Sequence, residues 1–333
     1  MPELRPFSQS AADIVKGDLK VMTLRETDVM RLLDPGALLD GLADGFQALA
    51  RHQIQTPDRP ELTVPGKGFL LSMPAWRKGS PMMVKMVCVF EGNLAQGLPN
   101  HLAMINLFDS NSGAPLCAMD GTYITGIRTA AAAILTVREI AGPDAKVATI
   151  VGAGVQGREH LRLLPLVRDF DEILVASLYF EDAQRLAQRE PKASAVEDLE
   201  AAVRRSDVVC LASHSDRPVI DPDWVRPGTH VTSVGYAPPL GELPVALARD
   251  HKLYVEDDAS FEPPPVGCGE LQQIDRSSAI RLGDALIGKA PLRESDEEIT
   301  VYKAMGIAME DLVAADLVYR RAVREGDLAH AIF

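Results

Sequence analysis

The sequence has little cysteine, no excess of basic residues and no long apolar run. Its four cysteines, Cys88, Cys117, Cys210 and Cys268, lie far apart and without metal-ligand spacing, which predicts reduced thiols, no metal site and a cytoplasmic protein. No apolar run approaches the roughly 18–20 residues that span a bilayer, and residues 1–20 lack the apolar block of a signal peptide. We therefore expect no membrane segment, and we interpret residues 1–20 as a loosely attached leader.

The charge balance excludes another class of partner. Lysine and arginine number 34 against 47 aspartates and glutamates, a formal net charge of -13. Nucleic acid or an anionic membrane would require clustered basic residues, so neither is expected as a partner. An anionic small ligand must instead be held by a few locally placed cations. With 333 residues, 47% of them hydrophobic, the chain is long enough for two domains with cores of their own.

A glycine-rich stretch carries the strongest functional signal. Residues 147–151 form a short apolar run typical of a strand buried on both faces. Gly152, Gly154 and Gly157 follow in G-x-G-x-x-G spacing and lead into a helical pattern. In that strand–turn–helix context the glycines allow a tight turn, close approach of a pyrophosphate and close helix packing. The stretch predicts dinucleotide binding at a helix N-terminus.

The pattern of elements around this loop predicts an α/β fold with two domains. After the loop, strands at residues 172–178, 207–212, 228–234 and 252–256 alternate with short helices, which is typical of a Rossmann-type doubly wound parallel sheet. Before it, short strands between residues 59 and 109 predict an antiparallel sheet in an α+β domain. The segment from Ile299 has helical spacing. We therefore predict a Rossmann NAD(P)-binding domain at residues 125–300, and a substrate-binding and dimerisation domain at residues 1–124 together with 301–333.

Lys85 is the most informative charge, because it interrupts the apolar run of residues 82–90. An ammonium group inside a strand is costly unless a partner neutralises it. We favour a functional lysine over one that snorkels to water at a sheet edge. If burial dominates, its pKa is lowered, which suits proton donation near neutral pH.

Other polar residues are less distinctive by themselves. Arg128 is expected in the first turn of a helix over residues 125–141, where the helix dipole does not favour a cation. A bound carboxylate would explain it, and a tolerated surface arginine explains it equally well. Arg59 fits a solvated loop, and Asn100 and His101 follow a turn that could present them to a cleft, although a solvated histidine is the simpler interpretation.

The end of the second parallel strand bears on the choice of cofactor. A carboxylate there would bind the ribose 2′-hydroxyl of NAD. The strand ends instead at Ala176-Ser177-Leu178, and no arginine follows to neutralise a 2′-phosphate. Glu181 and Asp182 lie further along, in the next predicted helix. The sequence thus predicts NADP or NAD, with a weak preference for NADP.

Together these stretches resemble the ornithine cyclodeaminase/μ-crystallin family from about Val21 onward. The order and spacing of several motifs make the resemblance specific: Met73-Pro74-Ala75, Lys85, Gly97-Leu98-Pro99, Leu107-Phe108-Asp109, Gly113-Ala114-Pro115-Leu116, Asp120-Gly121, Arg128-Thr129-Ala130-Ala131, the glycine loop with Gln156, and Lys303-Ala304-Met305-Gly306-Ile307-Ala308 with Asp311.

The resemblance implies an enzyme that uses a nicotinamide cofactor at a carbon–nitrogen bond. It further implies that Arg59, Lys85 and Arg128 hold the substrate carboxylate, and that Asn100 and Met305 also line the substrate site. The residues implied along the cofactor are Gly152, Gly154, Val155, Gln156, Gly157, Ser177, Ser213 and Val234. A homodimer is expected, because the N-terminal sheet cannot bury both of its faces alone.

One departure from the family pattern separates the possible activities. After the strand that ends at Val234, the pattern of the cyclodeaminases is Gly-Ala-Asp-x-Pro-Gly-Lys. In this sequence Ala237 takes the place of that aspartate. We therefore expect reduction of an α-imino acid to an L-amino acid, or the reverse oxidation, with Lys85 as the catalytic residue. The alternatives are an ornithine cyclodeaminase, with Glu242 as a substitute acid, and a non-catalytic NADP-bound protein like μ-crystallin.

Overall fold

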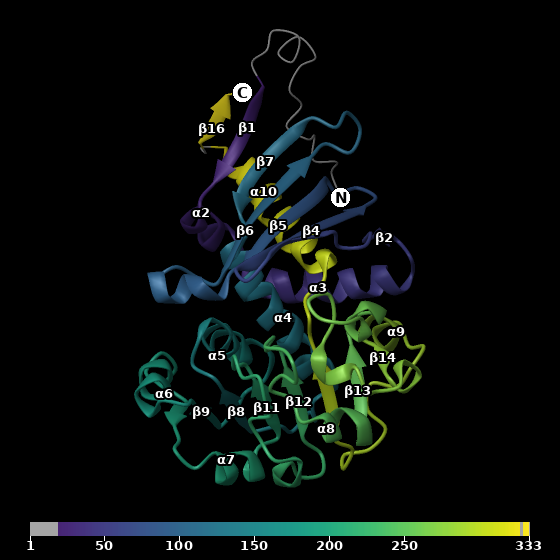
Figure 1. Cartoon of the computed structure of the whole chain (residues 1–333). Helices are drawn as coiled ribbons and strands as arrows, with labels where there is room; N and C mark the ends of the chain where they lie inside the picture. The colour runs from purple at the N-terminus through teal and green to yellow at the C-terminus, as the bar shows by residue number, and fades with distance from the viewer. Residues whose placement is uncertain (1–18, 327–328, 333) are drawn as a thin grey trace. The chain divides into compact units, whose positions relative to one another are not determined.

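The chain forms two compact units in the computed structural model, which describes residues 19–326 and 329–332 (Figure 1). The first unit contains the described residues up to Leu38, His52–Thr125 and those from Ala308 on. The second contains Leu39–Arg51 and Gly126–Ile307. Nearly all of the leader expected at residues 1–20 lies outside the described residues.

The sheet of the first unit is antiparallel except for one pair of strands. Its order is β16-β1-β7-β6-β5-β4-β2, with β3 also paired to β4, and β1 runs parallel to β7. The strands are β1 (Lys20–Leu24), β2 (Ile54–Gln55), β3 (Glu61–Val64), β4 (Gly68–Arg77), β5 (Met82–Val89), β6 (His101–Phe108), β7 (Pro115–Asp120) and β16 (His330–Ile332).

Helix α10 (Ala308–Glu325) packs on β4 and β5 and, with α2 (Glu26–Leu32), covers one face of this sheet. The alternation along β5 and β6 buries Val87 and Ile105 on the covered face and leaves Met86 and Met104 exposed on the other. The 3-10 helix η1 (Glu91–Gln96) joins β5 to β6. One face of the sheet is therefore buried under the helices, and the other face is apolar and exposed.

The second unit is a parallel sheet with strand order β10-β9-β8-β11-β12-β15-β13-β14. Its strands are β8 (Val147–Val151), β9 (Glu172–Ala176), β10 (Ala193–Ala195), β11 (Val208–Leu211), β12 (His230–Ser233), β13 (Lys252–Val255), β14 (Ile280–Arg281) and β15 (Thr300–Lys303). Its helices are α5 (Val155–Val167), α6 (Phe180–Ala187), α7 (Leu199–Arg205), α8 (Val245–Asp250) and α9 (Leu282–Leu286), while α3 (Pro35–Ala50) and α4 (Thr122–Ile140) begin in the first unit. The chain order reverses between β8 and β11, which is the switch point where doubly wound sheets bind ligands.

The helix predicted from Ile299 is wrong over its first residues. Thr300–Lys303 is a buried strand, β15, paired in parallel with both β12 and β13, and α10 begins only at Ala308. The positive φ of Gly306, 80°, interrupts a helix there. The unit boundary accordingly falls after Ile307. Residues 301–307 and 39–51 therefore belong to the second unit, whereas the sequence pattern predicted them in the first.

The start of α4 also differs from the prediction. The helix begins at Thr122 because the Asp120 carboxylate accepts the backbone N–H of Tyr123 at 2.9 Å. Arg128 therefore lies in the second turn, where the argument from the helix dipole no longer applies. The alanine run Ala130–Ala133 is fully buried, as its density of small residues predicts.

The described residues offer no membrane-spanning helix, no metal-binding cluster and no disulfide. None of their helices is long and apolar enough to cross a membrane, and no group of three or more His, Cys, Asp or Glu side chains among them could hold a metal ion. The four cysteines are free thiols, and burial raises the pKa of Cys117 and Cys210 to about 12.

Two histidines are completely buried in the second unit. His160 on α5 pairs through Nδ1 with the Gln156 carbonyl at 2.8 Å. His230 on β12 lies between the hydroxyls of Thr136 and Thr300, each at 2.8 Å. Burial lowers the pKa of His160 to about 4, and burial, with nearby Arg293 and Arg168, lowers that of His230 to about 3. Both are neutral in the folded protein.

These histidines should make the fold sensitive to mild acid. Below about pH 6.5 the unfolded chain binds protons that the folded histidines refuse, so stability falls as pH falls toward 4. Each histidine should cost about 2 kcal/mol at pH 5 relative to pH 7. Urea unfolding at both pH values should show that His230→Gln removes part of this loss, whereas His52→Gln, at an exposed position, does not. An identical loss in wild type and His230→Gln would contradict the assignment.

Candidate cofactor and substrate site

The glycine loop after β8 has the geometry that a dinucleotide requires. A Cβ on Gly152 would lie 2.3 Å from the Ala212 carbonyl oxygen, and one on Gly157 would lie 1.9 Å from that of Gly152. A Cβ on Gly154 would meet nothing within 4 Å. The first and third glycines therefore permit close backbone packing, and the second faces open space through which a pyrophosphate can approach.

The helix behind this loop has donors to offer. Gly154 is the N-cap of α5, and no side chain caps the helix there. The first turn of such a helix presents backbone N–H groups and the positive end of its dipole to an anion. Gln156 donates through Nε2 to the Gly126 carbonyl at 3.1 Å, and Val155 is 54% exposed. The uncapped N-terminus of α5 therefore fits a dinucleotide phosphate.

Ser177 follows β9, directly beside the glycine loop. Gly152 N–H donates to the Ala176 carbonyl at 2.8 Å, which joins the ends of β8 and β9. Ser177 is half-buried, while Leu178 and Tyr179 are 89% and 65% exposed. The next carboxylates, Glu181 and Asp182, lie in the first turn of α6, and Asp182 pairs with Arg185.

On the other side of the switch point, one carboxylate joins Ser213 to Val234. Glu242 is fully buried, and its Oε2 accepts both the backbone N–H and the hydroxyl of Ser213, each at 2.6 Å. Its Oε1 accepts the N–H groups of Val234 and Gly235 at 3.2 and 2.7 Å. The two predicted cofactor residues thus lie at the carboxyl ends of neighbouring strands and share one anchor.

A buried lysine reinforces the same strand ends. Lys303, at the end of β15, donates to the Glu270 carboxylate at 2.8 Å, the Gly235 carbonyl at 2.7 Å and the Ser233 hydroxyl at 3.2 Å. Burial alone would lower the pKa of Lys303, but nearby anionic groups, Glu270 foremost, raise it above its usual value. Lys303 is therefore a fixed cation with all three donors in use.

The segment after β15 is anchored by a second buried glutamate. The Glu256 carboxylate accepts the N–H groups of Met305 and Gly306 at 3.1 and 2.8 Å. Arg128, 4% exposed, lies against Gly306, because a Cβ on Gly306 would be 2.1 Å from its guanidinium. The structure therefore brings Arg128 next to the segment that contains Met305, and a glycine makes the room.

In the first unit, Lys85 forms a buried ion pair. Its Nζ lies 2.7 Å from Oδ2 of Asp311 on α10, with both side chains essentially inaccessible, and 3.5 Å from the hydroxyl of Thr125. The expectation that an ammonium group in this strand needs a partner is confirmed. Opposite charge at this distance stabilises the ammonium form, so burial does not act on the lysine alone.

The remaining predicted residues of the first unit lie at different distances from Lys85 along the sheet. Pro60 accepts the N–H of Ser72, so the backbone of Arg59 runs beside Met73, which is directly opposite Lys85. His101 pairs with Val89, so Asn100 lies beyond the far end of β5. The strand register therefore brings Arg59 toward Lys85 and places Asn100 several residues away.

The residues that sequence reasoning missed are the anchors. Glu242 was considered only as a substitute acid, and Lys303 and Asp311 only as parts of a motif. Lys303 and Asp311 carried one usable signal, since an ionisable residue inside an apolar pattern requires a partner. Glu242, in a loop, gave none.

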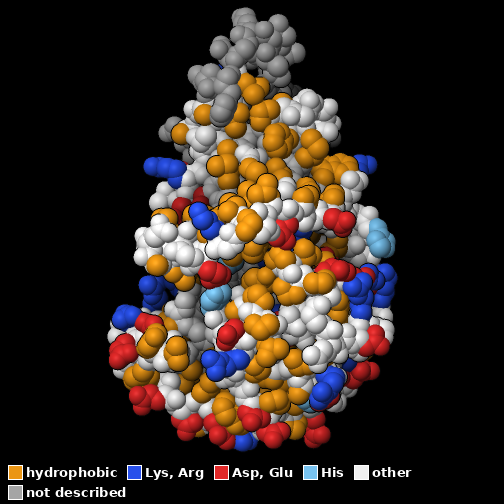
Figure 2. Space-filling model, viewed as in Figure 1, with side chains coloured by type: hydrophobic (Ala, Val, Ile, Leu, Met, Phe, Trp, Pro, Cys, Tyr) orange, Lys and Arg blue, Asp and Glu red, His pale blue; other side chains and the backbone are white. Residues whose placement is uncertain are grey.

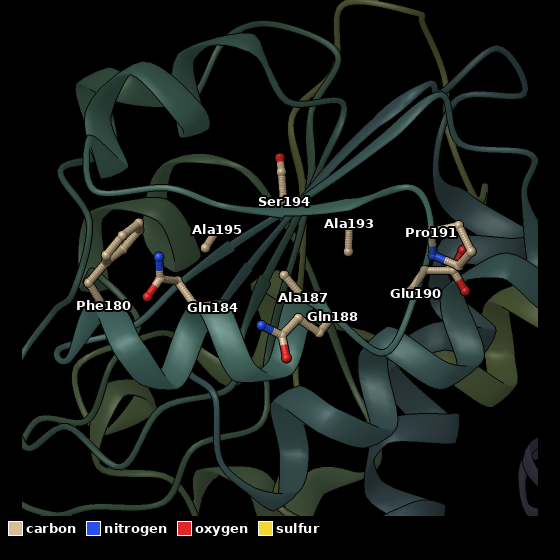
Figure 3. A pocket seen from close by; sticks show the side chains of 9 residues that line it. All are labelled: Phe180, Gln184, Ala187, Gln188, Glu190, Pro191, Ala193, Ser194 and Ala195. Carbon is tan, nitrogen blue, oxygen red and sulfur yellow. The ribbon is translucent and has the colours of Figure 1, made fainter.

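The structure also has a surface hollow that is unrelated to these groups. Figure 3 shows it between α6 and β10, at the edge of the parallel sheet. It contains none of the predicted site residues.

Comparison with known proteins places the chain. The model of the ornithine cyclodeaminase/mu-crystallin family matches residues 19–326. Ketimine reductase mu-crystallin from Mus musculus is 32% identical over 256 residues, 76% of this chain and 80% of that protein. The structure of Thermococcus litoralis Delta(1)-pyrroline-2-carboxylate reductase in complex with NADH and L-proline matches with 31% identity and a TM-score of 0.86, over 93% of this chain and 100% of that one.

An archaeal alanine dehydrogenase dimer with bound NAD matches with 28% identity and a TM-score of 0.87, over 94% of this chain and 99% of that one. The predicted α/β fold class, with a parallel Rossmann-type sheet and a separate antiparallel sheet, is confirmed. So is the predicted class of enzyme, an NAD(P)-dependent oxidoreductase that acts on carbon–nitrogen bonds. The chain belongs to the ornithine cyclodeaminase/mu-crystallin family.

Proposed function

We propose that this protein reduces the C=N bond of an α-imino acid with NAD(P)H to give an L-amino acid, or catalyses the reverse oxidation. The observation that carries the proposal is the buried Lys85–Asp311 ion pair, in a chain whose glycine loop is open to a dinucleotide. Its similarity to a ketimine reductase and to a pyrroline-2-carboxylate reductase supports the same substrate class.

The roles of the side chains follow from their chemistry. A bound NAD(P)H would supply the hydride to the imine carbon. Arg128 and Arg59 hold the substrate carboxylate through forked hydrogen bonds, which guanidinium groups form best. Lys85 gives a proton to the nitrogen as the amine forms and takes one back from solvent before the next turnover, and Asp311 orients its ammonium group.

The alternative of an ornithine cyclodeaminase has less support. Ala237 stands at the position where the cyclodeaminase pattern has an aspartate, so it offers no acid. Glu242 uses both of its oxygens to accept hydrogen bonds from backbone and hydroxyl donors. A non-catalytic binding protein would leave the buried Lys85–Asp311 pair with a structural role alone.

A substrate panel tests the proposal. Purified protein should oxidise NADPH or NADH with cyclic imino acids, or with 2-oxo acids plus ammonia or methylamine. L-Ornithine should yield little or no proline and ammonia. Binding of NADPH without oxidation across the panel would favour the binding protein, and robust cyclisation of ornithine would favour the cyclodeaminase.

Replacing Lys85 should separate chemistry from stability. Lys85→Met removes the proton donor and should lower kcat/KM on the order of 10²-fold or more. It also leaves Asp311 buried without its cation, which should cost about 3–5 kcal/mol of stability. Steady-state kinetics and urea unfolding measure the two effects.

The double variant Lys85→Met/Asp311→Leu is the control. It removes both charges, so it should recover stability but not activity. A purely structural ion pair predicts that the double variant recovers both, which would end the catalytic assignment of Lys85.

For the cofactor, we infer a preference for NADP(H) from Ser177, which replaces the carboxylate that would select NAD. Ser177→Asp should lower the ratio of kcat/KM for NADPH over NADH about tenfold or more, because a carboxylate repels the 2′-phosphate. Ser194→Asp adds the same charge to the exposed face of neighbouring β10 and should leave the ratio unchanged. A wild-type protein that strongly prefers NADH would overturn this inference.

For the assembly, we infer that a second copy of the chain covers the exposed face of the antiparallel sheet. Exposed apolar side chains lie on this face, on β3, β5 and β6: Leu62, Val64, Met82, Met86, Leu102 and Met104. Figure 2 shows hydrophobic side chains gathered over these strands. Met86 lies opposite Met104 in the register, so β5 and β6 share this patch. The similarity to an alanine dehydrogenase dimer supports a like partner.

A charge placed in this patch should break the dimer. Met104 is 52% exposed, and Met104→Glu would bury a carboxylate at the interface. Sedimentation should show a dimer for wild type and a monomer for Met104→Glu at micromolar concentration. Met30→Glu, at a 46% exposed position on α2, should remain dimeric. A monomeric wild type would contradict the inference.

A further inference from the structure

Glu242 occupies an unusual place for a carboxylate. It lies in the loop between β12 and α8, has no exposed surface, and lies at the carboxyl ends of β11 and β12. The strand order reverses immediately beside β11, so these strand ends border the crevice where a doubly wound sheet binds its dinucleotide.

Five donors converge on this one side chain. Oε2 accepts the N–H and the hydroxyl of Ser213, and Oε1 accepts the hydroxyl of Ser233 at 3.0 Å and the N–H groups of Val234 and Gly235. A carboxylate has about four lone-pair sites, so its acceptor capacity is filled. Both of its oxygens are therefore committed to backbone and hydroxyl donors of the two loops.

The peptide of Gly235 is held from both sides. Its N–H donates to Glu242, and its carbonyl accepts from Lys303 Nζ at 2.7 Å. A Cβ at this position would lie 2.5 Å from the Ser213 carbonyl oxygen and 2.6 Å from the Glu242 carboxyl carbon. The hydroxyl of Ser233 links the two charges, because it donates to Glu242 and accepts from Lys303 at 3.2 Å.

This arrangement fixes the backbone at the carboxyl ends of β11 and β12. Ser213 and Val234 follow adjacent parallel strands, and without a shared anchor each loop could move independently. Glu270, which pairs with Lys303, also lies against Gly241, where a Cβ would meet its carboxylate at 2.0 Å. The anchor is thus part of a continuous buried network that runs from β11 to β15.

We propose that Glu242 is a positioning residue that holds the loops after β11 and β12 in the geometry that binds the nicotinamide half of the dinucleotide, with Lys303 as its counter-clamp. The proposal rests on the proposed function, since it assigns these loops to NAD(P)H. It predicts that the anchor sets cofactor affinity even when no substrate is present.

Direct titration of NADPH against the full-length protein, followed by nicotinamide fluorescence without substrate, tests this. Glu242→Gln keeps the size of the side chain, but its amide NH₂ would face N–H and hydroxyl groups that now donate to the carboxylate. Its Kd for NADPH should rise on the order of tenfold to a hundredfold. Ser233→Ala keeps both charges and removes only the link, and its Kd should rise about threefold.

Asp207→Asn is the matched control within the same sheet. The Asp207 carboxylate accepts the N–H groups of Lys146 and Val147 at 2.7 and 2.9 Å, at the opposite edge beside the start of β8. This variant should lower the urea midpoint yet leave the Kd within twofold of wild type, because the loops at the carboxyl edge keep their anchor.

Three results would overturn the proposal: a folded Glu242→Gln with wild-type affinity, an equal loss of affinity in Asp207→Asn, or loss of one limb of the pH–rate profile in Glu242→Gln. The last would make Glu242 an acid or base, whereas a positioning residue lowers the profile without changing its limbs. If Glu242→Gln does not fold, Ser233→Ala decides, and unchanged affinity there overturns the proposal. A wild type that binds neither NADPH nor NADH would instead overturn the proposed function itself.

Discussion

Burial of charge is the constraint on which both units of this protein depend. A carboxylate or ammonium group leaves water only at a cost of several kcal/mol, unless fixed partners replace the lost hydration. Lys85 has Asp311, Lys303 has Glu270, and Glu242 has five donors. Each buried charge thus fixes the elements that supply its partners, so the polar groups that surround the candidate sites are also the ones that hold the local backbone in place.

The same constraint explains how an acidic chain can bind an anionic cofactor. The protein uses backbone N–H groups in two different ways at neighbouring strand ends. After β11 and β12 those groups are taken by its own carboxylate, Glu242, and the loops become rigid. After β8 no side chain caps α5, so the N–H groups of its first turn remain available to an external phosphate.

Much of the fold could be predicted because local pattern and tertiary environment agree. The glycine loop, the buried strand before it and the alternation after it each have one physical interpretation. The prediction failed at Thr300–Lys303, where a spacing of three and four residues is typical of a helix. Four residues are too few for periodicity to decide, and pairing with β12 and β13 on either side determines the structure there.

In the candidate site, too, the sequence identified single residues but not their partners. Lys85 could be identified because an ammonium group in an apolar strand demands a partner, but the sequence could not say that Asp311, in the last helix of the chain, supplies it. Glu242 was considered as an acid because chemistry alone permits that role. Only the positions of its five donors show that both oxygens are occupied.

The loss of an acid at Ala237 therefore has a structural meaning. Glu242 follows in the same loop, but its carboxylate is directed inward and committed to Ser213 and Gly235. A loop anchored in this way could not turn its glutamate outward without leaving five donors unsatisfied, which would cost more than a single hydrogen bond could return. The proposed function therefore assigns proton transfer to Lys85, whose ammonium group Asp311 holds in place from α10.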